Sequence, residues 1–284
     1  MNHLKKPMWE GHNSRVLVAA HRGARFIYPE NTMPAFRYAI EQGVDMIETD
    51  VRMTRDHQLV LMHDAAVDRT TDGKGAVCDM TLAEFKALNA AADYDDYPEG
   101  VSPPTLEEFL TLCSRHDGLL IDFELKEYPT PGREEWAYEC CDRTIEMLEA
   151  YGFGDRCVLN SFSARLLEYI VKKYGDRYRL HGYYPYAVLR DSDHEDPSWY
   201  KQYFYCLCIS SVAFGPDGPH RYNFNVPKKA YFDAVLAEGI EPWVCAGIYS
   251  EPEIIRCAEL GASLITTDYP ATILEALRRH GYHD

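Results

Sequence analysis

The amino-acid sequence predicts a single (β/α)8 barrel, the TIM-barrel fold, over residues 1–284, because strand-like and helix-like segments alternate along most of its length. Short apolar runs rich in Val, Ile and Leu are followed by longer amphipathic stretches. This alternation is typical of a parallel sheet covered by helices. The number of strand–helix units in about 250 residues is typical of an eight-stranded barrel. A chain of 284 residues that is 46% hydrophobic can bury one large core.

The first strand–helix unit shows how the element boundaries are predicted. An apolar run over 16–21 precedes a helix over 32–43, with Thr32 as its cap and Gly43 as its stop. Further strands are expected at 44–51, 59–63, 118–126, 156–162, 178–184, 205–211, 240–247 and 263–270. Further helices are expected at 105–115, 134–151, 163–174, 227–238 and 250–260.

These runs give nine strand candidates, one more than the barrel needs. The connection between the second and third candidates is shorter than the dozen or so residues of a parallel crossover. The two should therefore form an antiparallel hairpin that turns near TRDHQ (54–58), which leaves eight barrel strands. Residues 64–104 carry little strand pattern and many charged, Gly and Pro residues, so they predict a small lobe inserted over one face of the barrel.

Composition narrows the classes of partner. A formal net charge of −16 disfavours nucleic acid and anionic membranes as partners, and no apolar stretch approaches the ~20 residues of a membrane span. The first 15 residues lack the apolar region of a secretory signal, and the nine cysteines form no CxxC pair. We therefore expect a cytoplasmic protein without stable membrane association and without an exposed apolar loop cluster that would insert in a membrane. The oligomeric state is left open.

Carboxylates are expected to converge inside the barrel. Alternation of side chains along a strand directs Glu48 and Asp50 to one face, and likewise directs Asp122, Glu124 and Lys126 to one face. One interpretation is a salt-bridged polar layer. The other is a metal site, because converging buried carboxylates are costly without a cation. Oxygen ligands suit a hard ion such as Mg²⁺ or Ca²⁺.

Two histidines end predicted strands. His21 closes VLVAAH and His63 closes LVLMH, and the hairpin is expected to bring His63 beside Glu48. Each histidine taken alone could be a hydrogen-bonded structural residue, whereas the pair together with the carboxylates resembles an acid–base couple. Arg22 offers a fork of donors for an anion, and Gly23 is expected to let the backbone turn close to a ligand.

Several motifs in order give the chain a family resemblance. They are AHRGARFIYPENTMPAF (20–36), GVDMIETDVRMTRDHQLVLMHD (43–64), DRTTDGKGAV (68–77), IDFELK (121–126), LNSF (159–162) and LITTDYP (264–270). With these motifs the chain resembles the glycerophosphodiester phosphodiesterases, which are metal-dependent TIM barrels. The resemblance runs over nearly all of residues 16–278 and is densest over 19–84.

The resemblance implies a role for each residue that matches a family motif. It implies the catalytic histidines His21 and His63, the metal ligands Glu48, Asp50 and Glu124, and the phosphate contacts Arg22 and Lys126. Glu30 and Asn31 match a segment that buttresses the first loop, and a plain helix-start role is the alternative.

The chain departs from the family on its seventh barrel strand. It reads PWVCAG where the family has Trp-Thr-Val-Asn or a close variant. Trp243 is retained, either as a wall against the alcohol group or as a core residue, and Val244, Cys245 and Ala246 replace the polar residues after it. The departure bears on substrate preference.

The implied reaction is hydrolysis of a small-molecule glycerophosphodiester to sn-glycerol 3-phosphate and an alcohol. The implied cofactor is a divalent metal, Mg²⁺ or Ca²⁺, with Mn²⁺ as a further candidate. One histidine would act as base and the other as acid. The rivals are a phospholipase C- or D-like barrel acting on lipids and a catalytically silent barrel that binds a phosphodiester. Retention of both histidines and all three acids disfavours the silent barrel.

Overall fold

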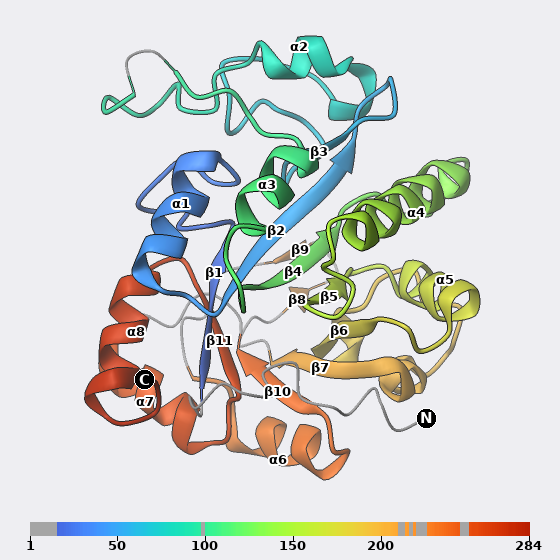
Figure 1. Ribbon diagram of the computed structural model, residues 1–284. Coiled ribbons are helices and arrows are strands. Elements are labelled where there is room, and N and C mark those ends of the chain that lie inside the picture. The colour runs from blue at the N-terminus through green and yellow to red at the C-terminus, as the bar shows by residue number, and fades with distance from the viewer. Residues whose placement is uncertain (1–15, 98–99, 210–213, 216–217, 220–225, 245–249) are drawn as a thin grey trace.

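The computed structural model describes residues 16–97, 100–209, 214–215, 218–219, 226–244 and 250–284. Its main feature is a closed barrel of eight parallel strands with helices around the outside (Figure 1). The barrel strands are β1 (Leu17–His21), β2 (Met46–Met53), β4 (Leu120–Leu125), β5 (Cys157–Asn160), β6 (Arg179–Tyr184), β7 (Phe204–Ile209), β10 (Glu241–Val244) and β11 (Leu264–Thr267). They neighbour one another in the order β1-β11-β10-β7-β6-β5-β4-β2, and the pairing of β1 with β2 closes the ring. The predicted (β/α)8 fold is confirmed.

Helices connect the strands at the predicted places. They are α1 (Met33–Gln42), α3 (Leu106–Cys113), α4 (Glu134–Ala150), α5 (Ala164–Tyr174), α6 (Lys229–Ala237) and α7 (Glu251–Glu259). A further helix, α8 (Pro270–Arg279), follows β11 and was absent from the prediction. Parts of two predicted strands, at 210–211 and 245–247, lie outside the described residues, as do Cys245, Ala246 and the N-terminal 15 residues.

The start of α1 shows one difference from the prediction. Thr32 takes the cap position, but its hydroxyl donates to the carbonyl of Pro29 at 2.6 Å and does not cap the helix. Gly43 ends the helix in the left-handed conformation at φ 79°, where glycine has no steric penalty. The helix therefore ends at a left-handed glycine, as predicted, but it begins without a cap from the Thr32 side chain.

Two separate apolar layers surround the strands. Met46, Leu120 and Trp243 belong to a cluster inside the barrel. Ile47 and Phe123, at alternate positions, belong to the larger cluster between the strands and the helices. Complete burial of such side chains is worth roughly 1.5–3 kcal/mol each. The alternation predicted for β2 and β4 is thus present, and it points the acidic positions of these strands inward.

The predicted hairpin extends β2 beyond the barrel. Strand β3 (Leu59–Leu61) pairs antiparallel with β2, with Val51 opposite Leu61. Residues 64–104, the predicted lobe, follow β3 and contain the short η2 (Val77–Asp79) and α2 (Leu82–Lys86). A small apolar cluster lies beneath them, made of Val60, Met62, Val67, Val77 and Phe85. Figure 1 shows α2 at one end of the barrel and α6 at the other.

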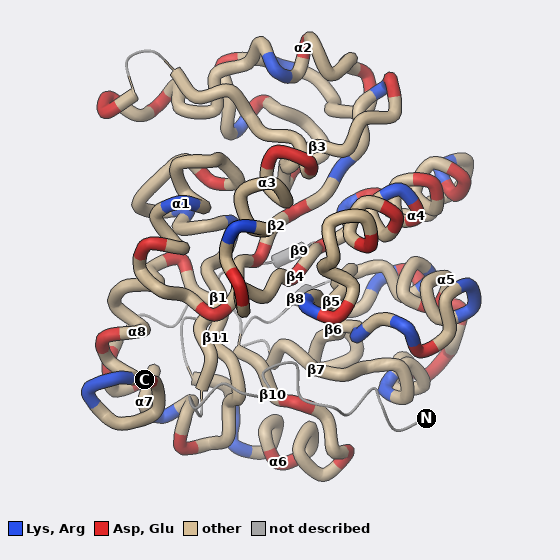
Figure 2. The backbone as a smooth tube through the Cα atoms, viewed as in Figure 1, with Lys and Arg blue, Asp and Glu red and all other residues tan. Residues whose placement is uncertain are grey.

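Charge is mixed over the outer helices. Acidic and basic positions are interspersed along α4 (Figure 2), where Arg143 bonds Glu139 one turn away. Exposed pairs of this kind contribute at most about 1 kcal/mol each. A helix long and apolar enough to cross a bilayer is absent from the part of the chain that the structure describes.

The C-terminus is tied to the barrel through a histidine that should make stability pH-dependent. His283 Nε2 lies 2.9 Å from Asp45 Oδ2, which also accepts the Val18 N–H at 2.8 Å. Burial alone would lower the pKa of His283, but its bonds to Asp45 and to the Asp284 carbonyl outweigh burial and raise that pKa. A raised folded pKa stabilises the fold fully below the unfolded value of about 6.5, and this stability is lost as pH rises through the folded pKa.

We therefore expect His283→Ala to lower the free energy of unfolding by about 1.5–3 kcal/mol near pH 6, the range for a charged hydrogen bond. The loss should shrink near pH 9, since the parent histidine is then neutral. Urea unfolding of parent and variant at the two pH values measures this difference. The exposed His280→Ala is the matched control on the same terminal segment. A deficit that stays constant or grows with pH contradicts the assignment.

Candidate active site

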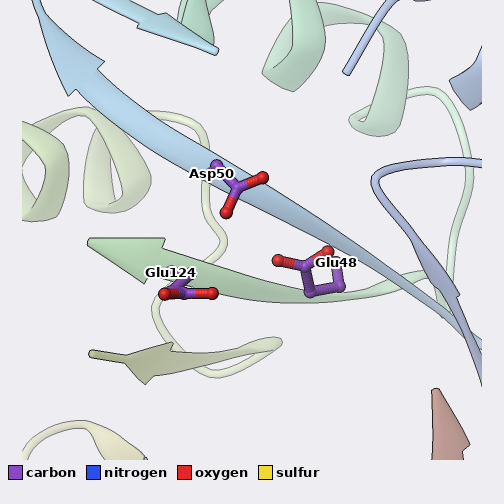
Figure 3. Close-up of side chains that lie close together, drawn as sticks. All are labelled: Glu48, Asp50 and Glu124. Carbon is purple, nitrogen blue, oxygen red and sulfur yellow. The ribbon is translucent and has the colours of Figure 1, made fainter. Parts of the chain in front are cut away.

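Three carboxylates from two neighbouring strands converge inside the barrel. Glu48 and Asp50 come from β2 and Glu124 from β4, and Figure 3 shows the three side chains turned toward one another. One oxygen from each lies within 4.8 Å of the others. The register of the sheet causes this meeting, because Asp50 pairs directly with Glu124 across β2 and β4. The three are called the acidic triad below.

The electrostatics of the acidic triad fit a bound cation. Burial, together with the charges of Asp50 and Glu124, raises the pKa of Glu48 well above its usual range. Burial also raises the pKa of Glu124, although the Lys126 ammonium opposes this shift. The Oδ1 atom of Asp50 is buried without a hydrogen bond and lies 3.2 Å from the Lys126 ammonium. Buried carboxylates that repel one another are the donor set that a hard divalent ion takes.

Two buried cations border the acidic triad. Arg22 Nε lies 3.4 Å from Asp50 Oδ2, and the Arg22 backbone N–H donates to Glu48 Oε2 at 2.9 Å. Lys126 Nζ lies 2.5 Å from Glu124 Oε1. Burial would raise the pKa of Asp50, but the charges of Lys126 and Arg22 outweigh it and hold that pKa well below its usual range. Arg22 and Lys126 therefore place hydrogen-bond donors beside the triad, where they could bind the oxygens of an anion.

His21 is held by a carboxylate at the end of another strand. Its Nδ1 lies 2.6 Å from Asp268 Oδ1, directly after β11, and its Nε2 lies 3.9 Å from Glu48 Oε2. Asp268 also lies 3.0 Å from Arg25 Nε. A carboxylate on Nδ1 keeps the proton there, so that Nε2 is the ring atom that faces the triad and can exchange a proton.

His63 is held in a similar way from the lobe side. Its Nδ1 lies 2.6 Å from Asp64 Oδ1, and Asp64 Oδ2 accepts from Arg69 Nε at 2.6 Å. Burial lowers the pKa of His63 to about 4, against the raising effect of the Asp50 charge. The Met62 N–H donates to the Asp50 carbonyl, and Asp50 is the carboxylate whose charge acts most on the pKa of His63, whereas the expectation named Glu48 as the neighbour.

The PENT segment buttresses the site. Asn31 is 3% exposed and its amide donates to Asp50 Oδ2 at 2.8 Å, while the Thr49 hydroxyl donates to Asn31 Oδ1 at 2.9 Å. Glu30 accepts from Arg22 at 2.9 Å and from both terminal nitrogens of Arg69. Of the two interpretations of these residues, the buttress is the one that the contacts support.

Packing requires glycine at position 23. Its φ of 86° favours glycine, and a Cβ there would lie 2.7 Å from the Cβ of Ala35. Close approach of the first loop to α1 therefore demands glycine at this position.

A second polar pair lies in the barrel interior. Asp122 Oδ2 is 2.8 Å from His181 Nδ1, and both residues are buried. The ring of Trp243 meets His181 edge-on with centroids 5.0 Å apart, and Trp243 is 0% exposed. This placement favours the core interpretation of Trp243 over a wall against the alcohol.

Sequence reasoning missed three residues of the site. Asp268 stands in the quoted LITTDYP, and its position directly after a barrel strand was the available signal. Asp64 directly follows His63 in the sequence. The sequence therefore showed a carboxylate next to this histidine, but it did not show that the two side chains bond to each other. Arg69 could not be found in this way, since only tertiary structure brings it to Glu30.

Comparison with known proteins bears on the identity of this site. The model of the glycerophosphoryl diester phosphodiesterase family matches residues 21–272. The glycerophosphodiester phosphodiesterase of Caldanaerobacter subterraneus subsp. tengcongensis is 31% identical, and the match covers 94% of this chain and 100% of the relative. That of Bacillus altitudinis is 29% identical over 89% of this chain and 94% of the relative. A phosphodiesterase from Oleispira antarctica, solved in complex with the product sn-glycerol-3-phosphate, superposes with a TM-score of 0.74 at 24% identity, covering 92% and 96% of the two chains.

Proposed function

This chain belongs to the glycerophosphoryl diester phosphodiesterase family, and from that membership we propose that it hydrolyses glycerophosphodiesters to sn-glycerol 3-phosphate and an alcohol. The observation that carries the proposal is the meeting of the acidic triad with two histidines, each paired through Nδ1 with an aspartate. Such a site can bind a phosphodiester and move protons on both sides of it.

The residues around the acidic triad have separate chemical roles. Arg22 and Lys126 bind phosphate oxygens, with Arg22 supplying a planar fork of donors. One histidine takes the proton of the attacking oxygen, and the other gives a proton to the departing alcohol. Each transfer is worth roughly 10²–10⁴ in rate. Asp268 and Asp64 hold the two rings in the orientation and tautomer that this exchange requires.

The acidic triad would hold the divalent ion. Glu48, Asp50 and Glu124 offer oxygen donors alone, which suits Mg²⁺, Ca²⁺ or Mn²⁺. When bound, such an ion neutralises the three carboxylates and stabilises charge on the phosphoryl group. Arg22 and Lys126, now paired with Asp50 and Glu124, could then turn toward the substrate.

Free thiols support the proposed cytoplasmic location. The buried free thiols among the described residues include Cys113, Cys140, Cys141, Cys157, Cys206 and Cys257. Reduced cysteines are typical of a cytosolic protein.

The direct test is release of sn-glycerol 3-phosphate from glycerophosphocholine with added Mg²⁺, Mn²⁺ or Ca²⁺. Release of phosphocholine instead would indicate phospholipase C-like cleavage on the other side of the phosphorus. Turnover of phospholipid vesicles but not of the soluble diester would indicate a lipid enzyme. Binding of the soluble diester without any turnover would indicate the silent barrel.

The attacking oxygen gives a sharper prediction. A hydroxyl of the substrate's own glycerol lies next to the phosphorylated carbon, so its attack is favoured by proximity over attack by water. The cyclic phosphate formed would then be opened by water with the histidine roles exchanged. We expect a glycerophosphocholine analogue with that hydroxyl methylated to be hydrolysed at least about 10²-fold more slowly, the lower range of a proton-transfer contribution.

The unmethylated diester, run in parallel, is the control, and competition between the two shows whether the analogue still binds. Hydrolysis of the analogue at the parent rate would show that water attacks directly. The roles of the triad and of the histidines would survive that result.

A further inference from the structure

An apolar rim stands beside the candidate active site and takes no part in the chemistry described above. It consists of Phe26 and Ile27, whose exposed fractions are 52% and 38%. Among the described residues the remaining exposed large hydrophobic is Leu236, on α6. Both residues of the rim lie on the loop that follows His21.

The rim is held in place by its own loop. The N–H groups of Ile27 and Tyr28 both donate to the carbonyl of the buried Ala24, at 2.8 and 2.9 Å. The Tyr28 ring packs on Tyr38 and Tyr97, with centroids 5.0 and 6.3 Å apart. Since the turn and its aromatic anchor fix the loop, Phe26 and Ile27 are presented to solvent without a further ordering cost.

The rim is joined to the His21 side of the site. The Phe26 ring contacts Tyr269, with centroids 5.6 Å apart, and the Arg25 guanidinium lies 4.5 Å from the Phe26 centroid. Tyr269 directly follows Asp268, and Arg25 Nε lies 3.0 Å from the Asp268 carboxylate that holds His21. These contacts place the rim on the same side of the site as His21.

We propose that the rim of Phe26 and Ile27 binds the alkyl part of the substrate's alcohol, so that the enzyme prefers soluble glycerophosphodiesters whose alcohol carries a hydrocarbon chain. The inference rests on the proposed function. Glycerol carries hydroxyls that need hydrogen-bond partners, and these two side chains offer none. A hydrocarbon chain gains by covering them. The rim thus assigns the alcohol group to the His21 side of the phosphate.

The test is a series of glycerophospho-n-alkanols from ethanol to octanol, with glycerophosphoglycerol as the polar reference, all below their micellar concentrations. We expect kcat/KM of the parent to rise with chain length, by up to about fourfold for each methylene that reaches the rim. In the double variant Phe26→Ser, Ile27→Ser the ratio of kcat/KM for the octyl ester to that for the glycerol ester should fall at least about tenfold, the equivalent of two methylenes.

Leu236→Ser is the matched control. Its side chain is 48% exposed, but it lies near the end of α6, before β10 begins and thus at the opposite face of the barrel. In this variant kcat/KM should rise with chain length as steeply as it does in the parent. Thermal unfolding of all three proteins separates loss of the rim from loss of the fold.

Three results would overturn the assignment. A parent kcat/KM independent of chain length, or a double variant that keeps the parent slope, removes the rim from substrate binding. If the protein bound phosphatidylcholine vesicles through the rim while kcat/KM in the soluble series did not change with chain length, the rim would be a lipid-binding surface instead. If the parent hydrolyses no member of the series, the proposed function fails and the rim assignment fails with it.

Discussion

Dialysis against EDTA is expected to abolish hydrolysis of glycerophosphocholine, and added Mg²⁺, Mn²⁺ or Ca²⁺ to restore it. The reason is the acidic triad, in which burial, together with the charges of Asp50 and Glu124, raises the pKa of Glu48 far above its usual value. The isosteric variants Glu48→Gln, Asp50→Asn and Glu124→Gln should each weaken Mn²⁺ binding at least about tenfold in calorimetric titration. A tenfold loss of affinity is the smallest effect expected even for a residue that only supports a metal ligand, so a ligand itself should lose at least as much.

Asp122→Asn is the matched control for these variants. Asp122 is a buried, inward-facing acid on the same strand as Glu124, but it bonds His181 and lies outside the triad. It should keep the parent affinity for Mn²⁺. Glu48→Gln should also leave the metal-free protein at least as stable to heat as the parent, because it removes a buried repulsion. Full turnover after exhaustive chelation would contradict the metal assignment, whatever the variants do.

His21→Ala and His63→Ala are each expected to lower kcat by at least about 10²-fold while Mn²⁺ binding is retained. Each ring is oriented by an aspartate through Nδ1. His21 Nε2 lies 3.9 Å from Glu48 Oε2, and the charge of Asp50 acts on His63. Asp268→Asn should produce a smaller loss than His21→Ala, since it disturbs the tautomer and leaves the ring. His57→Ala is the control, because His57 is exposed on the hairpin turn and bonds Glu139 on α4.

A substrate with an acidic leaving group can tell the two histidines apart. Glycerophospho-p-nitrophenol needs no proton on its departing oxygen, so the variant that lacks the general acid should regain most of its rate on this ester. The variant that lacks the base should not. The rim beside His21 predicts that His21→Ala is the rescued variant. A loss of only a few-fold in either alanine variant on glycerophosphocholine would remove that histidine from the chemistry.

Local sequence pattern determined most of the fold and the positions of the acids. The alternation along β2 and β4 directs Glu48, Asp50 and Glu124 inward whatever surrounds them, because successive side chains of a strand face opposite ways. The shortness of the connection between β2 and β3 forced a hairpin for the same kind of local reason. His21 and Arg22 were found because they end an apolar run at the face where such barrels carry their sites.

Tertiary structure alone decided which side chains meet across long stretches of chain. Asp268 reaches His21 only because β11 pairs with β1, and Arg69 reaches Glu30 only because the segment after β3 lies against the first loop. The exposure of Phe26 depends on how neighbouring segments pack around it. The sequence of one loop does not show whether other segments bury its apolar side chains. Strand periodicity is a property of adjacent residues, whereas the closure of a barrel and the docking of a lobe depend on contacts among segments far apart in the chain.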